Sequence, residues 1–194
     1  MRYGIDTTGP QFWNGEAPEL AVSGPNVGSN LYLAVHFSGT VGTAVYAAKN
    51  KKIPAIAFSG KSDGTLAWNT DPVPQRSKVY AQLAAQLTDA VIASGKPYLP
   101  EDVFLNVNFP EVNDKCNDAS QFKWVLSRIN IGLFSASDVK TCGNTRLPTE
   151  LSVVDKDGCY ISISVGDAND KTTAPAEKQA VVLEKLGRML TCLP

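Results

Sequence analysis

The chain has 194 residues, of which 43% are hydrophobic and 19% charged, and its formal net charge is −1. This length suffices for one domain with its own core, and the composition excludes intrinsic disorder. The chain has no basic excess that would favour binding to a nucleic-acid polymer or an anionic membrane, so neither partner is expected. The apolar runs are far shorter than the roughly 20 residues of a membrane span, and residues 1–20 lack the pattern of a signal peptide.

The first half of the chain alternates between strand and helix patterns. A short apolar run at residues 20–23 predicts a strand that ends in the glycine-rich loop 23–30 (SGPNVGSN). The turn 38–40 (SGT) precedes a predicted apolar helix at 41–48. Residues 52–59 are almost continuously apolar, which is typical of a parallel strand covered on both faces. This order predicts an α/β fold with a parallel sheet.

The middle of the chain carries clearer boundaries. Residues 63–74 are rich in turn-forming residues and predict a loop. Residues 75–94 have an amphipathic pattern that predicts a long helix, and Gly95 and Pro97 end it. Residues 103–109 (VFLNVNF) alternate in polarity and predict a strand.

The last third has a different texture. Residues 122–131 predict a strand, and 137–148 a loop. Residues 151–154 and 159–165 predict a pair of strands across a turn. An apolar stripe along 174–190 predicts a final amphipathic helix.

These elements predict a single domain over residues 1–194, without internal repeats. Residues 1–17, which are rich in glycine, proline and polar residues, predict a loop-like lead-in. Residues 113–170 predict a β-rich extension built on the same core.

The four cysteines are Cys116, Cys142, Cys159 and Cys192, and no two of them form a CxxC pair. With His36 as the one histidine, this spacing disfavours a zinc site. An even number of widely spaced cysteines favours two disulfides and an oxidising, secretory compartment. Of the three possible connectivities we favour Cys116–Cys142 with Cys159–Cys192. Four reduced thiols in the core are the alternative.

Two glycine-containing segments predict an anion site. Small residues in the loop 23–30 and at the turn 38–40 allow backbone N–H groups to face an anion. The dipole of the helix that follows favours negative charge at its N-terminus. A bound phosphate group is the natural ligand of such a cradle.

Four ordered segments carry a resemblance to a known family: 23–30 (SGPNVGSN), 38–42 (SGTVG), 53–57 (IPAIA) and 105–110 (LNVNFP). They resemble the SurE family of metal-dependent 5′/3′-nucleotidases and acid phosphatases, and the cysteine-bearing second half resembles its secreted fungal branch. The resemblance implies a SurE-like, Rossmann-type parallel sheet flanked by helices. It also implies a phosphate monoester or nucleotide as substrate, and a homo-oligomer.

The resemblance implies roles for five residues. Asn26 matches an amide ligand of a divalent metal, Mg or Mn, whose preferred ligands are oxygens. Asn30 is expected near the phosphate, and Ser38, Gly39 and Thr40 match a phosphate-binding turn. The alternatives are plain turn asparagines and a helix N-cap at Ser38 or Thr40. A cap and an anion use the same free amides, so both roles are compatible.

The metal-binding part of the family pattern is incomplete in this sequence. SurE proteins begin with a strand that ends in a paired Asp-Asp, followed by a serine ligand, and this chain matches the family only after both. Asp6 does not substitute for the pair, so no catalytic residue is assigned. The resemblance implies a metal-dependent phosphomonoester hydrolase. The alternatives are an inactive phosphate-binding homologue that lacks the N-terminal portion, and a purely structural fragment.

Other polar and aromatic candidates are weaker. His36 is close to the phosphate turn, but a structural role is the simpler interpretation. Trp68 lies in the 63–74 loop and is a candidate for stacking on a nucleobase, with local loop packing as the alternative. Asp63, Asp71 and Asp102 lie in or next to loops and are expected to be solvated.

Overall fold

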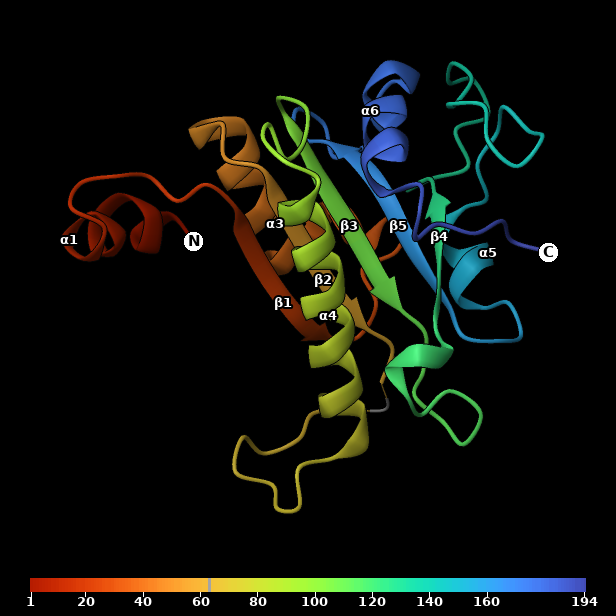
Figure 1. Ribbon diagram of the computed structural model, residues 1–194, viewed down its shortest axis with the longest axis horizontal. Helices are drawn as coiled ribbons and strands as arrows, with labels where there is room; N and C mark the ends of the chain where they lie inside the picture. Colours follow the sequence, from red (N-terminus) through yellow and green to blue (C-terminus); the bar gives the residue numbers. More distant parts are fainter. Residues whose placement is uncertain (63) are drawn as a thin grey trace.

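The computed structural model describes residues 1–62 and 64–194. Within these residues a five-stranded sheet has the order β1-β2-β3-β5-β4 (Figure 1). The strands are β1 (Ala21–Val27), β2 (Ala55–Gly60), β3 (Val103–Phe109), β4 (Lys123–Ser127) and β5 (Tyr160–Asp167). The neighbours β1–β2, β2–β3 and β4–β5 are parallel, whereas β3 and β5 are antiparallel. The α/β class is confirmed, with a mostly parallel sheet.

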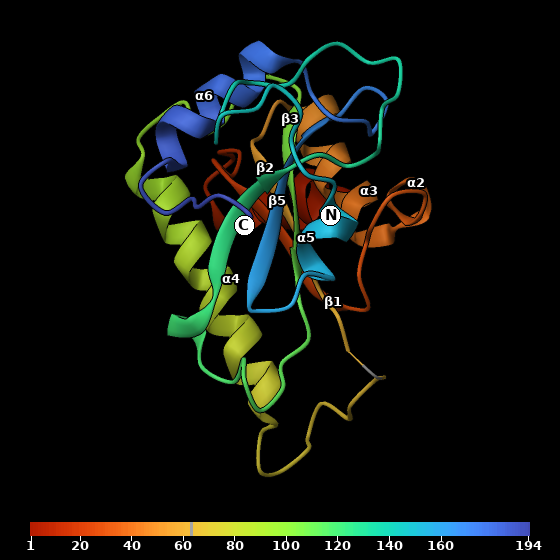
Figure 2. The same ribbon diagram turned by 90° about the vertical axis from the view of Figure 1, so that its right-hand side faces the viewer.

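Helices cover both faces of the sheet. On one face lie α4 (Gln75–Ala93) and α6 (Ala176–Leu186) (Figure 2). The other face carries α2 (Ala34–Phe37), α3 (Gly39–Val45) and α5 (Glu150–Val154). This three-layer arrangement is the usual outcome for a parallel sheet that is buried on both sides.

Most of the periodic segments form the predicted elements. The strand β3 and the helix α4 lie within their predicted ranges, β2 ends one residue beyond its range, and α6 occupies the centre of its range. The helix after the SGT turn continues beyond α3 as η2 (Tyr46–Asn50). Of the predicted 63–74 loop, residues 64–74 form neither helix nor strand.

The predicted loop-like lead-in is instead helical. It contains η1 (Gly4–Thr8) and α1 (Gly9–Phe12). Asp6 accepts a hydrogen bond from the Tyr46 hydroxyl at 2.6 Å and pairs with Lys51 at 2.8 Å. Because both partners are about 40 residues away in the chain, composition alone could not reveal this anchoring. The prediction of a loop was therefore wrong.

The first predicted strand is longer than expected. β1 continues to Val27 through part of the glycine-rich segment, with a shift in its register against β2 between Ser23 and Asn26. Gly24 has φ 101°, and a Cβ there would lie 2.1 Å from the Phe58 carbonyl oxygen. Only glycine fits this close approach to the neighbouring strand.

The predicted pair of strands near residue 150 was wrong in its first member. Residues 150–154 form α5, and only the second member forms a strand, β5. The Thr149 hydroxyl accepts a hydrogen bond from the Ser152 N–H at 3.2 Å and caps the helix. The cap and the burial of Val153 and Val154 outweigh the strand propensity of two adjacent valines. β4 is also shorter than its predicted range.

Two disulfides are present, but the favoured pairing was wrong. The bonds are Cys116–Cys159 and Cys142–Cys192. The first joins a turn before β4 to the start of β5. The second joins the 137–148 loop to the C-terminal segment. The first pair lies next to the parallel pairing of β4 with β5, and the second lies near the contact of Trp124 with Leu190. Cysteine spacing reveals neither contact.

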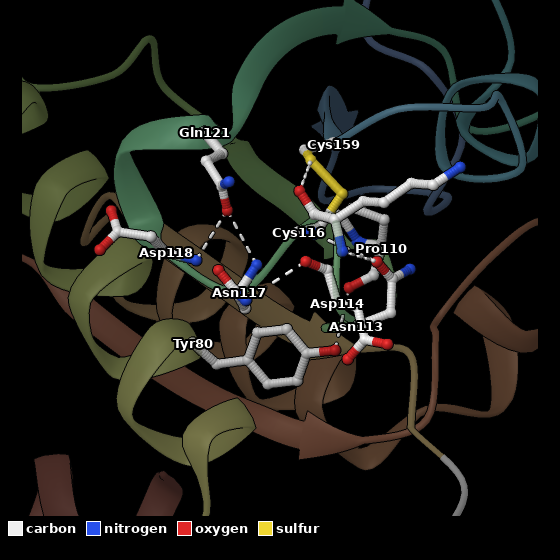
Figure 3. The surroundings of a disulfide bond; sticks show 10 residues. Tyr80, Pro110, Asn113, Asp114, Cys116, Asn117, Asp118, Gln121 and Cys159 are labelled. Carbon is white, nitrogen blue, oxygen red and sulfur yellow. Dashed lines mark hydrogen bonds between the residues drawn. A yellow bond between two sulfur atoms is a disulfide. The ribbon is translucent and has the colours of Figure 1, made fainter.

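Figure 3 shows how the first disulfide is anchored. The Cys116 N–H donates a hydrogen bond to the Asn113 carbonyl at 3.0 Å, which closes the turn. Tyr80 of α4 donates a hydrogen bond from its hydroxyl to the Pro110 carbonyl at 2.9 Å (Figure 3). The covalent bond and this contact hold the segment after β3 against the core.

Candidate functional site

The strands β1, β2 and β3 run in parallel and end at one edge of the sheet, at the bottom of Figure 1. In open α/β sheets this carboxyl edge is where ligands bind. Asn26 lies there, partly exposed, near the end of β1. Its Nδ2 donates a hydrogen bond to the Gly28 carbonyl at 3.0 Å. The amide nitrogen therefore serves the turn, and the Oδ1 atom is the one that a cation would bind.

Asn30 is buried, with 7% of its surface exposed, and ties the loop after β1 to the sheet. Its N–H donates to Asn108 Oδ1 at 2.8 Å, and its Nδ2 donates to Ser59 Oγ at 2.5 Å. Its carbonyl accepts from Asn106 Nδ2 at 2.9 Å and from Asn108 Nδ2 at 3.1 Å. The structure thus gives Asn30 an anchoring role, and its contact with phosphate stays a prediction.

Ser38 caps α3, as one of the alternatives for the SGT turn predicted. Its Oγ accepts a hydrogen bond from the Val41 N–H at 3.1 Å. Gly39 is exposed and Thr40 half-buried at the start of the helix. Because α3 returns antiparallel to β1 and packs on β1 and β2, this end of the helix lies at the carboxyl edge. The Ser38 hydroxyl hydrogen and the first amides of α3 can face an anion there.

A pocket of about 340 Å³ adjoins Asn26 at the ends of β1 and β2. Its lining includes Gly60, Trp68, Val73 and Arg76. Trp68 is 97% exposed, so it is not packed into the loop that carries it. The pocket brings Asn26 and Trp68 together, whereas Asn30 and the SGT turn lie outside its lining.

The sequence interpretation missed a group of buried polar side chains that extends inward from Asn30. Strand register places Ser59 opposite Asn108 and Asn106 opposite Ser164 on one face of the sheet. The first residue of α5, Glu150, completes the group. We call these residues the polar cluster: Asn30, Ser59, Asn106, Asn108, Glu150, Ser162 and Ser164.

Glu150 is the titratable member of the polar cluster. Its side chain is fully buried, and its Oε1 accepts a hydrogen bond from Asn106 Nδ2 at 2.7 Å. Burial raises the pKa of Glu150 to about 8. Contacts with Asn106, the Ser164 side chain and the Tyr32 backbone lower the pKa, but burial dominates. Burial therefore favours the neutral form of this carboxyl group.

A sequence signal for part of the polar cluster exists. The buried strands carry polar residues two positions apart, Asn106 with Asn108 and Ser162 with Ser164. Such spacing in an otherwise apolar strand directs both polar side chains to one face. Glu150 gives no such signal, because an acidic residue just after an N-cap is typical of an ordinary exposed first turn.

The described residues do not by themselves fit a divalent metal centre. Among them, no group of three or more His, Cys, Asp or Glu side chains could hold a metal ion. Asp71 is exposed, Asp102 pairs with Lys52 at 2.7 Å, and Asp63 lies outside the described residues. The single neutral oxygen of Asn26 does not hold a dication without anionic partners.

His36 is exposed at the end of α2, and its carbonyl accepts a hydrogen bond from Lys171 at 2.8 Å.

No helix in the described part of the chain has the length and hydrophobicity needed to span a bilayer.

The sequence of the chain is similar to those of known proteins. The family model "Survival protein SurE" matches residues 2–130. An acid phosphatase of Yarrowia lipolytica is 35% identical over 194 residues, an alignment that covers 85% of this chain and 54% of the relative. A 5′-nucleotidase SurE of Geobacter sulfurreducens is 43% identical over 97 residues, covering 50% of this chain and 32% of the relative.

A solved structure supports the fold. The crystal structure of the SurE protein from Aquifex aeolicus aligns with a TM-score of 0.54 at 22% identity, covering 86% of this chain and 64% of that one. The chain thus spans about half the length of the acid phosphatase and a third of the nucleotidase. The family match extends over more than half of the chain, from residue 2 to just beyond β4. The chain therefore belongs to the SurE family.

Proposed function

We propose that the chain takes part in metal-dependent hydrolysis of phosphate monoesters, nucleotides among them. The observation that carries this proposal is the shared edge of the sheet. There Asn26, the capped start of α3 and an open pocket lie at the carboxyl ends of the parallel strands. The acid phosphatase and nucleotidase relatives support the reaction class.

Each part of this edge has a proposed role. The Ser38 hydroxyl and the amides of Gly39 and Thr40 hold the phosphate, where the dipole of the helix favours negative charge. The same preorganised donors stabilise charge that develops on the phosphoryl oxygens. Asn26 Oδ1 would supply one neutral ligand to Mg or Mn. The described residues lack a cluster of anionic ligands that would complete the coordination of the metal.

The pocket beside Asn26 is proposed to hold the organic part of the ester. Trp68 presents an exposed indole next to this pocket, and an aromatic face can stack on a nucleobase. Arg76 also lines the pocket, although its Nη2 donates to the Gly64 carbonyl at 2.6 Å. A nucleotide would use both the phosphate turn and this surface.

A second candidate is phosphate binding without turnover. The absence of a carboxylate cluster among the described residues favours it. The two disulfides and the fungal acid phosphatase relative support a secreted protein. A homo-oligomer is also proposed, on the family resemblance.

Two measurements on the purified chain separate these candidates. The first is thermal unfolding with and without inorganic phosphate, since a ligand of the folded state raises Tm. The second is hydrolysis of p-nitrophenyl phosphate and adenosine monophosphate with Mg²⁺ or Mn²⁺, compared with EDTA. Stabilisation with metal-dependent turnover supports hydrolysis, and stabilisation alone supports phosphate binding. A folded chain that shows neither contradicts both.

Matched cap variants test the phosphate turn itself. Ser38→Ala removes the cap of α3, and Asp118→Ala removes the cap of the short helix η3 (Ala119–Gln121), where Asp118 accepts from the Ser120 N–H at 2.8 Å. Each loses about 1 kcal/mol of stability with its cap. Only Ser38→Ala should also lose the phosphate-induced rise in Tm. An equal response in both variants would place the phosphate elsewhere.

A further inference from the structure

Three buried side-chain oxygen atoms of the polar cluster have no hydrogen-bond partner among the described residues: Glu150 Oε2, Asn106 Oδ1 and Ser162 Oγ. The first two belong to side chains that are already joined by the 2.7 Å hydrogen bond from Asn106 Nδ2 to Glu150 Oε1. Both atoms are acceptors if Glu150 is ionised. An ionised Glu150 would therefore leave two buried acceptors unsatisfied and a buried charge without a countercharge.

One proton removes both defects. A proton on Glu150 Oε2 makes that atom a donor, and Asn106 Oδ1 is an acceptor without a partner on the amide that already contacts this carboxyl group. The carboxylic acid and the primary amide can then exchange two hydrogen bonds, one in each direction. Burial favours this neutral form and raises the pKa of Glu150 to about 8.

The charged groups near α5 have other partners. The helix packs against β3, β4 and β5. Arg128, just after β4, donates to Asp138 at 2.6 Å, and Lys123 lies over the Tyr160 ring at 5.6 Å. The Glu150 pKa depends on burial and hydrogen bonds, with no charged side chain among its causes.

The acid–amide pair also reaches the candidate site. Asn106 Nδ2 donates to the Asn30 carbonyl at 2.9 Å as well as to Glu150. Asn108 contacts the same main chain from both sides, through the N–H and the carbonyl of Asn30. The orientation of the Asn106 amide therefore helps to fix the loop that begins at Asn26.

We propose that Glu150 carries a proton at neutral pH, forms a carboxylic acid–amide pair with Asn106, and through it positions the Asn30 segment of the candidate site. Glu150 is in this sense a positioning residue, because it contacts the loop only through Asn106 and the Tyr32 backbone. Its relevance to catalysis rests on the proposed function. The pair itself can be tested without substrate.

Infrared spectroscopy of the whole chain tests the proton. We expect the C=O band of a protonated carboxylic acid at pH 7, which disappears with a midpoint near pH 8. Glu150→Gln should remove this band yet fold, because the glutamine amide can exchange the same two hydrogen bonds with Asn106. Glu177→Gln is the matched control, an exposed acid in the first turn of α6, and should keep the band. A wild-type spectrum without the band at pH 7, or a band that survives Glu150→Gln, would overturn the proposal.

Amide hydrogen exchange tests the positioning. Exchange of residues 28–33, corrected for intrinsic rates, reports opening of the loop. If opening of the loop exposes Glu150, the population of the open state in the wild type should rise about tenfold per pH unit between pH 5 and 8. Above pH 8 this population should level off. Glu150→Gln should remove this slope, and Glu177→Gln should retain it. If the wild type lacks the slope although the carboxylic acid band is present, Glu150 is protonated but does not position the loop, and that part of the proposal is wrong. Should Glu150→Gln fail to fold, the wild-type titrations alone still decide.

Discussion

The sheet face under α4 and α6 and the opposite face are built from the same strands with different side chains. On β2, Ile56 and Phe58 enter the core under α4, whereas Ala57 and Ser59 point the other way. The first face buries large apolar groups throughout. The second changes from small apolar residues under α3 to the polar cluster toward the carboxyl edge. Burial on this second face serves hydrogen bonding at the candidate site as well as stability.

This contrast explains why the two faces should respond differently to mutation. Truncation of an apolar side chain loses transfer free energy and leaves a cavity. Its effect is confined to the free energy of unfolding. A truncated member of the polar cluster leaves its partners unsatisfied, and several of those partners belong to the loop that follows Asn26. Stability and ligand response should therefore change together only on the polar face.

The largest effect is expected on the apolar face. Phe58→Ala removes a fully buried ring that stacks on Phe109 at a centroid distance of 5.7 Å. We expect a loss of about 3–5 kcal/mol in the free energy of unfolding, measured with urea. The control is Phe37→Ala, since Phe37 is 89% exposed, and should change stability by less than about 0.5 kcal/mol. A loss below about 1 kcal/mol for Phe58→Ala would contradict this core.

On the polar face, the next largest effect is a pH dependence. The pKa of Glu150 is raised from 4.5 to about 8 in the folded chain. The contribution of Glu150 to the free energy of unfolding is complete below about pH 4.5. It is lost as pH rises toward 8, because the carboxyl group releases its proton at a lower pH in the unfolded chain than in the folded one. The stability of the wild type relative to Glu150→Gln should fall by about 1.4 kcal/mol per pH unit across this window. Urea unfolding at several pH values measures it, and parallel profiles for the two proteins would contradict a raised pKa.

The sequence predicted the elements whose local signals agree with their packing. α4 combines a long apolar stripe with glycine and proline at its end, and β2 and β3 carry strand patterns in the order that a parallel sheet requires. Predictions failed where distant contacts decide. The helix at α5 depends on a cap and on burial against β5. The disulfides depend on how β5 and the C-terminal segment pair with β4.

The candidate site also combines features that follow from local sequence with features that depend on distant contacts. The N-cap at Ser38 follows from local chemistry and was foreseen as an alternative. The anchoring of Asn30 joins residues 78 positions apart, and the Glu150 contact joins residues 44 positions apart. Both depend on the register of β3, which hydrophobic pattern alone does not fix for strands buried on both faces.

Adjacent residues of β3 provide a direct comparison of the faces. Asn108→Ala removes two hydrogen bonds to Asn30, and Val107→Ala trims a fully buried side chain on the opposite face. Each should lower the free energy of unfolding by about 1–3 kcal/mol. We compare the phosphate-induced rise in Tm of each variant with that of the wild type, after correction for the lower stability of the variant. Only Asn108→Ala should show a smaller rise than the wild type. The same phosphate response in both variants would mean that the polar face does not position the candidate site.

The smallest expected effect concerns two glycines, one within β1 and one directly after it, which separate backbone strain from a steric contact. Gly24 and Gly28 have φ angles of 101° and 93°, so alanine is strained at both. A Cβ at Gly24 would lie 2.1 Å from the Phe58 carbonyl, whereas at Gly28 it meets nothing within 4 Å. Gly24→Ala should therefore cost about 1 kcal/mol more in urea unfolding than Gly28→Ala. Because the added contact pushes β1 from β2 near Asn26, the phosphate response should also fall more in Gly24→Ala. Equal costs would mean that β1 can shift freely, and the position of Asn26 would then depend on the Asn30 anchor alone.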